Sequence, residues 1–121
     1  MQRFRFDASA AAPMTAHASR GVRAGPVQST PALLVVTALG IEPGGEMGEH
    51  EAPLDRLLLV VAGEGWVSGV AGDPVTTRAG EAAFLRAGER HRLGSRLGMR
   101  AIVLEGEGLD PGAHLEAVVD G

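Results

Sequence analysis

Short apolar segments, broken by glycine-rich turns at intervals of about ten residues, constrain the fold of this chain more than any other feature. Residues 32–41 (ALLVVTALGI) are rich in β-branched side chains and end at Pro43-Gly44-Gly45, as expected of a strand followed by a loop. Further strands are predicted for residues 54–61, 66–70, 75–78, 81–86 and 99–105, with a break at Gly63-Glu64-Gly65. This succession of short strands indicates an all-β sandwich or barrel.

The two ends of the chain are expected to lie outside the barrel core. The barrel is predicted over residues 31–106, after an N-terminal extension (1–30) with an edge strand at 3–6 and a loop at 7–19. The tail, residues 107–121, is predicted to contain either a short helix or a last strand. With 121 residues and no internal repeat, the sequence has room for one hydrophobic core.

One predicted strand is apolar on both of its faces. Residues 57–61 (LLLVV) place large apolar side chains at odd and even positions alike, so both faces must be covered. One face would fill the barrel interior, while the other needs a second sheet, the N-terminal extension or a partner subunit. We expect a homodimer sealed by this sheet, and coverage from within the chain is the alternative.

The absent residue types exclude several kinds of chemistry. The sequence has no Cys, Tyr, Lys or Asn, so disulfides, thiolate zinc sites, cysteine nucleophiles, lysine Schiff bases and tyrosine acids cannot form. All 11 basic residues are arginines, which suit the recognition of carboxylates and phosphates. Any site in this chain must therefore be built from His, Asp, Glu, Arg, Ser and Thr.

Charge and hydropathy exclude several classes of partner. The formal net charge of −4 and the scarcity of aromatic residues provide neither a basic surface nor a stacking platform for nucleic acid. No apolar run reaches the roughly 18 to 20 residues of a membrane-spanning helix, and the first residues lack the apolar core of a secretory signal. We therefore expect a cytoplasmic protein without nucleic-acid or membrane partners.

Two of the four histidines are candidates for a site. His17 and His114 have no second ligand-type residue at a useful spacing and are expected to lie on the surface. His50 and His91 each lie beside a predicted strand end, in the glycine-bounded segments GGEMGEHEAPLD and GERHRLGS. Because they are far apart in the sequence, only a closed β fold would bring the two imidazoles together.

These histidines belong to two patterns that resemble the motifs of the cupin family. In the first pattern, Gly44 precedes His50 and Gly63 follows within AGEGWVSG. In the second, Gly80 precedes the segment RAGERH, which ends at His91. The resemblance implies a double-stranded β-helix, or jelly-roll barrel, that is commonly dimeric and has a small-molecule pocket in the barrel mouth. In that family three histidines and a glutamate usually hold a divalent metal there, and members range from oxygenases, isomerases and decarboxylases to proteins that only bind.

The sequence departs from the family pattern at half of the usual metal ligands. The place of the second histidine is taken by Ala52, and the place of the glutamate by Arg56. In the second motif, Arg86 replaces the usual proline and Ser95 the usual asparagine, which affects the turn more than the ligands. His50 and His91 are the two ligands that the sequence retains.

Arg56 changes the chemistry expected of the pocket. Positions 50, 52 and 56 share a strand parity, so Ala52 and Arg56 should point into the barrel with His50. A guanidinium has no acceptor lone pair and opposes a divalent cation, but it can hold a carboxylate or phosphate through two parallel hydrogen bonds. Alternatively, Arg56 turns outward and pairs with an acidic neighbour, for which the candidates are Asp55, Glu49 and Glu51.

The sequence leaves the metal question open. Glu46 shares the parity of His50, so His50, His91 and Glu46 could form a two-histidine, one-carboxylate site for Fe, Mn, Zn or Ni. Two histidines with waters would give a weaker site, and a metal-free pocket is the third alternative. Trp66 is either a core or interface aromatic or a ligand-stacking residue, while Arg92 is expected on a solvated rim.

Two functions from different classes are therefore predicted. The first is a binding or sensing barrel in which Arg56, His50, His91 and Trp66 contact a small, anionic organic ligand without catalysis. The alternative is a metal-dependent oxygenase, isomerase or lyase with His50 and His91 as ligands. A barrel that is merely filled by side chains and serves as a structural module is a third possibility.

Overall fold

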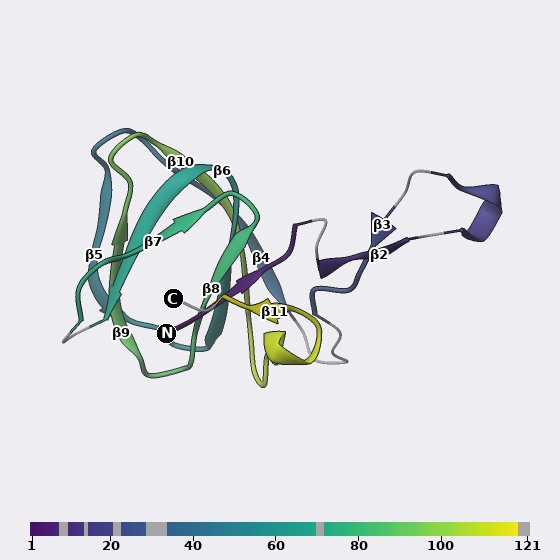
Figure 1. Ribbon diagram of the computed structural model, residues 1–121. Coiled ribbons are helices and arrows are strands. Elements are labelled where there is room, and N and C mark those ends of the chain that lie inside the picture. The colour runs from purple at the N-terminus through teal and green to yellow at the C-terminus, as the bar shows by residue number, and fades with distance from the viewer. Residues whose placement is uncertain (8–9, 14, 21–22, 29–33, 70–71, 119–121) are drawn as a thin grey trace.

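The protein is a β-barrel with an extended N-terminal arm, in a computed structural model that describes residues 1–7, 10–13, 15–20, 23–28, 34–69 and 72–118 (Figure 1). The strands of the barrel and its ends are β1 (Gln2–Arg5), β4 (Val35–Ile41), β5 (Glu46–Glu51), β6 (Asp55–Gly69), β7 (Val75–Arg78), β8 (Glu81–Leu85), β9 (Arg90–Gly94), β10 (Met99–Gly106) and β11 (Glu116–Ala117). The arm contains β2 (Ala12–Pro13), η2 (Ala16–Ala18) and β3 (Arg23–Ala24), and a 3-10 turn, η3 (Pro111–Ala113), precedes β11.

Strand β6 is the element that joins the two walls of the barrel. Its first half lies between β8 and β10, in the order β11-β1-β8-β6-β10-β4, and its second half pairs with β7 and β9. The predicted break at Gly63-Glu64-Gly65 is wrong, because the strand continues through it. Gly63 has a φ of 74°, and a Cβ there would come within 2.2 Å of the carbonyl oxygen of Gly98, so only glycine lets β6 and β10 meet this closely.

The sequence prediction missed strands β5 and β9. Their sequences, EMGEHE and RHRLG, carry many charged residues, so local propensity gave little sign of a strand. The two strands pair with each other, and their outward side chains form the ion pairs Arg90–Glu49 and Arg92–Glu46. Cross-strand charge pairs of this kind allow a polar segment to serve as a barrel wall.

The buried apolar residues form two clusters on opposite faces of β6. The inner cluster lies inside the barrel and consists of Ala52, Leu58, Val60, Val67, Ala83, Leu85, Leu93, Met99, Ala101 and Val103. The outer cluster lies under the two chain ends and consists of Phe4, Leu57, Leu59, Ala82, Phe84, Leu109 and Leu115.

The outer cluster explains why residues 57–60 are apolar at both parities. Leu57 and Leu59 pack under Phe4 of β1 and under Leu109 and Leu115 of the tail. Coverage from within the chain, the alternative to a dimer interface, is therefore what buries this face. Val61 lies beyond the cluster and is exposed.

The ends of the chain differ in part from their predictions. The segment predicted as a loop at 7–19 contains β2 and η2, and the β2–β3 arm extends away from the barrel (Figure 1). The tail holds both the turn η3 and the strand β11, where one or the other was predicted. Residues 32–33, 70 and 119 of the predicted elements lie outside the described residues. Among the described residues, we find no helix of the length and apolar character needed to cross a membrane.

Candidate functional site

The barrel brings His50 and His91 together. They lie opposite each other on β5 and β9, and their ring centroids are 4.3 Å apart with the planes tilted by 57°. Ala52, predicted to share their face, is buried in the inner cluster. The closed fold thus produces the convergence that was expected from the sequence.

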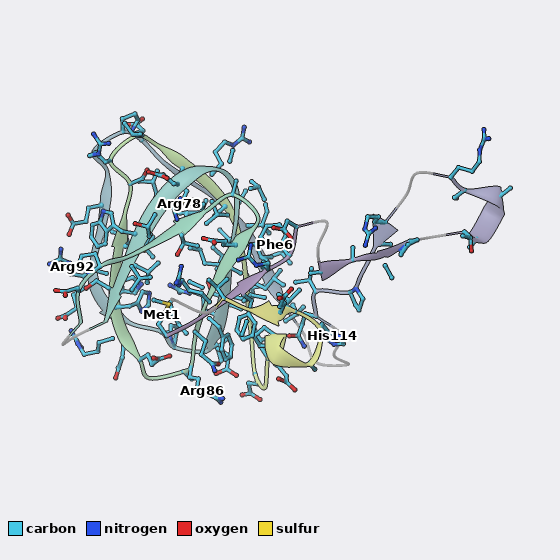
Figure 2. All side chains as sticks on the ribbon, in the orientation of Figure 1. Met1, Phe6, Arg78, Arg86, Arg92 and His114 are labelled. Atoms are coloured by element: carbon cyan, nitrogen blue, oxygen red, sulfur yellow. The ribbon has the colours of Figure 1, made fainter. Side chains whose placement is uncertain are left out.

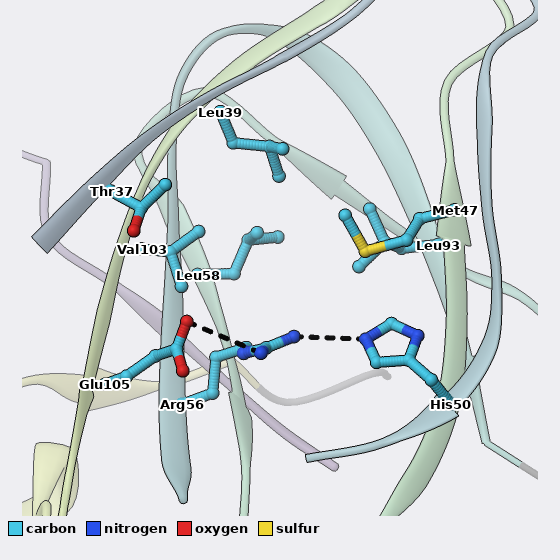
Figure 3. Close-up of a pocket in the computed structure, with 9 residues that line it drawn as sticks. All are labelled: Thr37, Leu39, Met47, His50, Arg56, Leu58, Leu93, Val103 and Glu105. Atoms are coloured by element: carbon cyan, nitrogen blue, oxygen red, sulfur yellow. Dashed lines mark hydrogen bonds and ion pairs between the residues drawn. The ribbon is translucent and has the colours of Figure 1, made fainter. Parts of the chain in front are cut away.

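Hydrogen bonds fix the tautomer of His50. Its Nδ1 lies 2.7 Å from the carbonyl oxygen of Gly48, which can only accept, so Nδ1 carries the proton. Its Nε2 lies 3.2 Å from Nη1 of Arg56, which can only donate, so the lone pair of Nε2 faces the guanidinium (Figure 3). His50 is therefore held as a neutral imidazole, and the lone pair of its Nε2 accepts a hydrogen bond from Arg56.

Arg56 points into the barrel and pairs with a carboxylate that the sequence did not single out. Its Nη2 lies 3.4 Å from Oε1 of Glu105, and the two side chains are only 14% and 21% exposed (Figure 3). Strand pairing explains the contact, since Arg56 on β6 is the register partner of Glu105 on β10. Two of the three proposed outward partners are engaged elsewhere: Asp55 accepts the backbone N–H groups of Ala87 and Leu109, and Glu49 pairs with Arg90.

A cavity of about 140 Å³ lies beside this charged pair. Its walls are mainly apolar, and its polar groups gather at one end, where Arg56, Glu105 and His50 meet (Figure 3). The remaining lining residues are Thr37, Leu39, Met47, Leu58, Leu93 and Val103. A small apolar cavity with convergent polar groups at one end is the usual form of a small-molecule site.

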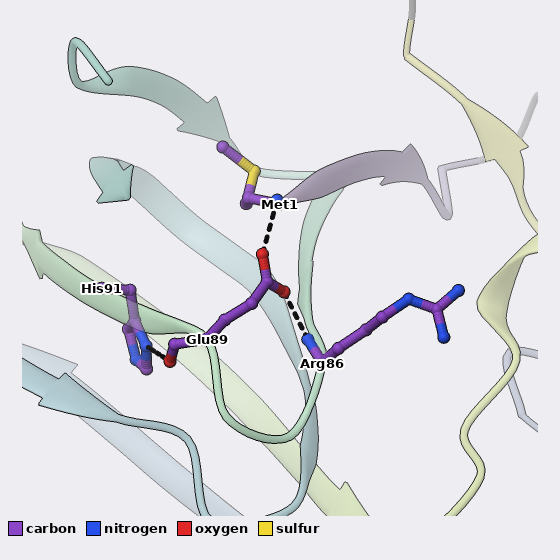
Figure 4. A network of polar contacts seen from close by, with 4 residues as sticks. All are labelled: Met1, Arg86, Glu89 and His91. Atoms are coloured by element: carbon purple, nitrogen blue, oxygen red, sulfur yellow. Dashed lines mark hydrogen bonds and ion pairs between the residues drawn. The ribbon is translucent and has the colours of Figure 1, made fainter. Parts of the chain in front are cut away.

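His91 lies deeper than His50 and is fully buried. Its Nδ1 lies 3.3 Å from the carbonyl oxygen of Glu89, so Nδ1 carries the proton and Nε2 is an acceptor (Figure 4). Burial lowers the pKa of His91 below its ordinary value, and the positive charge of Arg56 adds to this effect, although contacts with Glu89 oppose it. His91 is therefore neutral near pH 7.

Glu89 connects this histidine to the start of the chain. Its carboxylate accepts hydrogen bonds from the Met1 ammonium group at 2.9 Å and from the backbone N–H of Arg86 (Figure 4). Burial by itself would raise the pKa of Glu89, but the bonds and the charge of the ammonium group outweigh it and lower the pKa. The carboxylate is thus held in its charged form next to the turn that leads to His91.

Two buried polar atoms near the cavity have no hydrogen-bond partner among the described residues. They are Nε of Arg56, a donor, and Nε2 of His91, an acceptor. The third such atom, Oγ1 of Thr77, lies on β7. Of these residues Arg56 lines the cavity, and because buried polar groups are normally paired, its unpaired donor suggests that the site receives a ligand.

The residues present do not fit a divalent metal. The described part of the chain contains no group of three His, Cys, Asp or Glu side chains that could hold a metal ion. In addition, the lone pair of His50 faces a permanent positive charge on Arg56, which a cation would have to displace. Two histidines beside a guanidinium make a poor donor set for a cation.

Glu46 is not brought to the histidines, which corrects its expected place as a third ligand. Met47 pairs with Leu93 and His50 pairs with His91, so the two residues Gly48 and Glu49 of β5 face the single residue Arg92 of β9. This β-bulge reverses the parity and turns Glu46 to the outer face, where it pairs with Arg92 at 3.3 Å.

Trp66 also lies outside the cavity, contrary to its expected role in ligand binding. Its ring rests against Gly94, where a Cβ would come within 2.6 Å of it, and Arg92 lies over the ring at 5.4 Å. Arg92 is on the outside of the barrel wall, as expected of a solvated rim (Figure 2). Trp66 thus packs over Gly94, which has no side chain, on the outer face of the barrel.

Glu105 and Glu89 are the site residues that the sequence prediction missed. For Glu105 a signal was present: in the strand at 99–105, the positions of Met99, Ala101 and Val103 alternate inward, and Glu105 continues that face. For Glu89 there was none, because its role depends on a turn and on the distant Met1.

Comparison with known proteins identifies the family of this fold. A family model described as "Cupin" matches residues 2–119. No curated protein matches the sequence.

Solved structures resemble the barrel at low sequence identity. A conserved protein of unknown function from Streptococcus pyogenes is 19% identical with a TM-score of 0.57, over 61% of this chain and 64% of that one, which is less than two thirds of its length. An RmlC-like cupin with a double-stranded β-helix fold from Methanocaldococcus jannaschii is 10% identical with a TM-score of 0.59, over 70% and 75%. A DMSP lyase from Ruegeria pomeroyi is 21% identical with a TM-score of 0.56, over 62% and 39%. The predicted all-β barrel of cupin type is thereby confirmed.

Proposed function

Because the chain belongs to the cupin family, we propose that it binds a small organic acid in the cavity beside Arg56, without catalysing a reaction. The observation that carries this proposal is the unpaired Nε–H of a buried arginine at the polar end of an apolar cavity. A guanidinium has five N–H donors in a planar fork, and two of its three nitrogens contact His50 and Glu105. The Nε–H is therefore the nitrogen of this guanidinium that has no partner among the described residues, and a carboxylate is the natural acceptor for it.

The metal-dependent enzyme is the weaker candidate. Its support is the pair of adjacent histidines, and one of the similar structures is a lyase, but a likeness at such low identity concerns the fold alone. The engaged lone pair of His50 argues against it. Elemental analysis of protein purified without a His-tag is expected to find no stoichiometric metal. A near-stoichiometric metal that is lost in both His50→Ala and His91→Ala would favour the enzyme instead.

Ligand binding can be tested by thermal unfolding in the presence of carboxylates and phosphates. A ligand at 100 times its Kd that binds only the folded protein adds about 2.7 kcal/mol of stability. The Arg56→Leu variant should lose this stabilisation, and Arg56→Lys, which keeps the charge but not the fork, should retain part of it. Arg90→Leu on the outer face is the matched control and should respond like the wild type.

Two results would contradict the proposal. One is that no organic acid stabilises the wild-type protein at millimolar concentration. The other is that both Arg56 variants respond to the acids as the wild type does, which would place the binding elsewhere.

A further inference from the structure

We propose that the cavity selects monocarboxylates with a compact apolar body and rejects dicarboxylates and phosphate, and that Glu105 is the residue that imposes this selection. This inference rests on the proposed function and names its ligand class. It follows from the charge at the polar end of the cavity and from the size and character of the cavity walls.

The charge at the polar end is balanced before any ligand arrives. Arg56 supplies one positive charge and Glu105 one negative charge, 3.4 Å apart, and both side chains are largely buried. His50 adds no charge, because its proton is on Nδ1 and bonded to Gly48, and His91 is neutral as well. Thus the site has a single cation, which already faces one carboxylate.

With this balance of charge, the site can accept a ligand with one negative charge but not a ligand with two. A monocarboxylate can pair with the Arg56 guanidinium beside Glu105, so that two carboxylates share one guanidinium. A second carboxylate on the ligand would enter a mainly apolar cavity with no further cation among its lining residues. Charges without partners in such surroundings are strongly disfavoured, and repulsion from Glu105 adds to that cost.

The size of the cavity limits the part of the ligand that the cavity can enclose. A volume of about 140 Å³ is close to that of an engineered apolar cavity of about 150 Å³ that binds benzene. The body of the ligand would lie against Leu39, Leu58, Leu93 and Val103, with the flexible side chain of Met47 adapting to its shape. Benzoate and short branched acids such as isovalerate have the required size and a single acidic group.

Titration calorimetry with matched probes tests the selection at pH 7.5. Isovalerate and succinate have similar sizes but one and two carboxylates, respectively; benzoate and benzyl alcohol differ in the acidic group; and inorganic phosphate is the compact dianion. We expect isovalerate and benzoate to bind at least tenfold more tightly than succinate, phosphate and benzyl alcohol.

A substitution at Glu105 assigns the selection to that residue. In Glu105→Gln the carboxylate is replaced by a neutral group of the same shape, so succinate should gain at least fivefold in affinity relative to isovalerate. Glu107→Gln removes a negative charge from the exposed turn after β10 and should leave the ratio unchanged. Should Glu105→Gln fold poorly, Glu105→Ala provides the same comparison.

The possible outcomes separate this inference from the proposed function. If succinate or phosphate binds the wild type as tightly as isovalerate, the selection is wrong while the organic-acid site stands. A ratio that is the same in Glu105→Gln and the wild type contradicts the role of Glu105. Should none of the acids bind, both the proposed function and the selection fail.

Discussion

The two faces of strand β6 are built in opposite ways. On the outer face, Leu57 and Leu59 lie in a cluster that consists only of apolar side chains. On the inner face, Leu58 borders a cavity of about 140 Å³, and the neighbouring inward position is Arg56. One strand therefore carries, on one side, an apolar cluster in which Leu57 is fully buried and, on the other side, a partly polar cavity that Leu58 lines.

This difference separates the residues that hold the fold from those that can serve a ligand. A filled apolar cluster is sensitive to any loss of volume, because the surrounding side chains cannot close the gap. A cavity lined by unpaired polar atoms lacks packing contacts and hydrogen bonds that would otherwise stabilise the fold. Such a loss of stabilising contacts is expected at a site where a ligand supplies the missing contacts.

Truncation of the leucines on the two faces should give the largest contrast. Leu57→Ala, at a fully buried position of the outer cluster, is expected to cost about 3–5 kcal/mol, and Leu58→Ala, beside the existing cavity, about 2–3 kcal/mol. Urea unfolding at constant m-value measures both. Leu58→Ala should also enlarge the cavity and admit larger acids, whereas Leu57→Ala should leave ligand selection unchanged. Equal effects on binding would contradict the division between the faces.

The buried ion pair of the inner face should behave as a unit. Arg56→Leu and Glu105→Leu each leave one charged group largely buried without its partner, so each is expected to cost about 1–3 kcal/mol. The double variant removes both charges and should lose less than the sum of the two single variants. A double-mutant cycle from denaturant unfolding measures this coupling, and strict additivity would show that the two side chains do not interact.

The inner face should also be sensitive to pH. Because burial lowers the pKa of folded His91, the unfolded chain takes up a proton at its ordinary pKa of about 6.5 while the folded chain does not. Stability is therefore present above about pH 6.5 and falls as the pH drops below it. The wild type should lose more stability between pH 7.5 and 5.5 than His91→Gln does.

The control for this pH dependence is His114→Gln, which changes a histidine outside the barrel (Figure 2). It should lose as much stability as the wild type over the same range. Glu89, whose pKa is lowered, contributes only at more acidic pH, where its carboxylate becomes protonated. An equal loss in His91→Gln and the wild type would mean that His91 is not the titrating group.

A dimer remains a proposal, and its surface is no longer the face of Leu57. Among the described strands, β4 pairs with β10 alone, and it carries the exposed side chains of Val35 and Val36. An uncharged edge strand of this kind favours pairing with a second copy. Light scattering at high micromolar concentration should show a dimer that Val36→Glu weakens, and a strictly monomeric wild type would contradict it.

The sequence predicted the architecture better than the orientation of individual side chains. Glycine-punctuated apolar segments were sufficient for the barrel, and the spacing of the two motifs was sufficient for the meeting of His50 and His91. Strand parity favoured the inward direction of Arg56, with an outward pairing as the alternative, and the structure has the inward direction. These features depend on period and spacing, which a single sequence displays directly.

The features that could not be predicted depend on irregular backbone or on contacts between distant segments. The bulge in β5 places Glu46 on the outer face of the strand instead of the inner face, and no local sequence pattern predicts this bulge. The continuation of β6 through Gly63 depends on the close approach of Gly98. Likewise, the pairing of Arg56 with Glu105 needed the register between β6 and β10, which is a property of the folded sheet.

The most direct test of an acid site at Arg56 is the NMR signal of its own Nε–H group. With 15N-labelled arginine, and with Arg56→Lys used to assign the resonance, benzoate can be titrated into the wild-type protein at pH 7.5. If the carboxylate takes the Nε edge, this resonance shifts and saturates with the same Kd that calorimetry gives. Should benzoate bind while the Arg56 Nε–H signal stays in place, the acid lies elsewhere and the central claim is wrong.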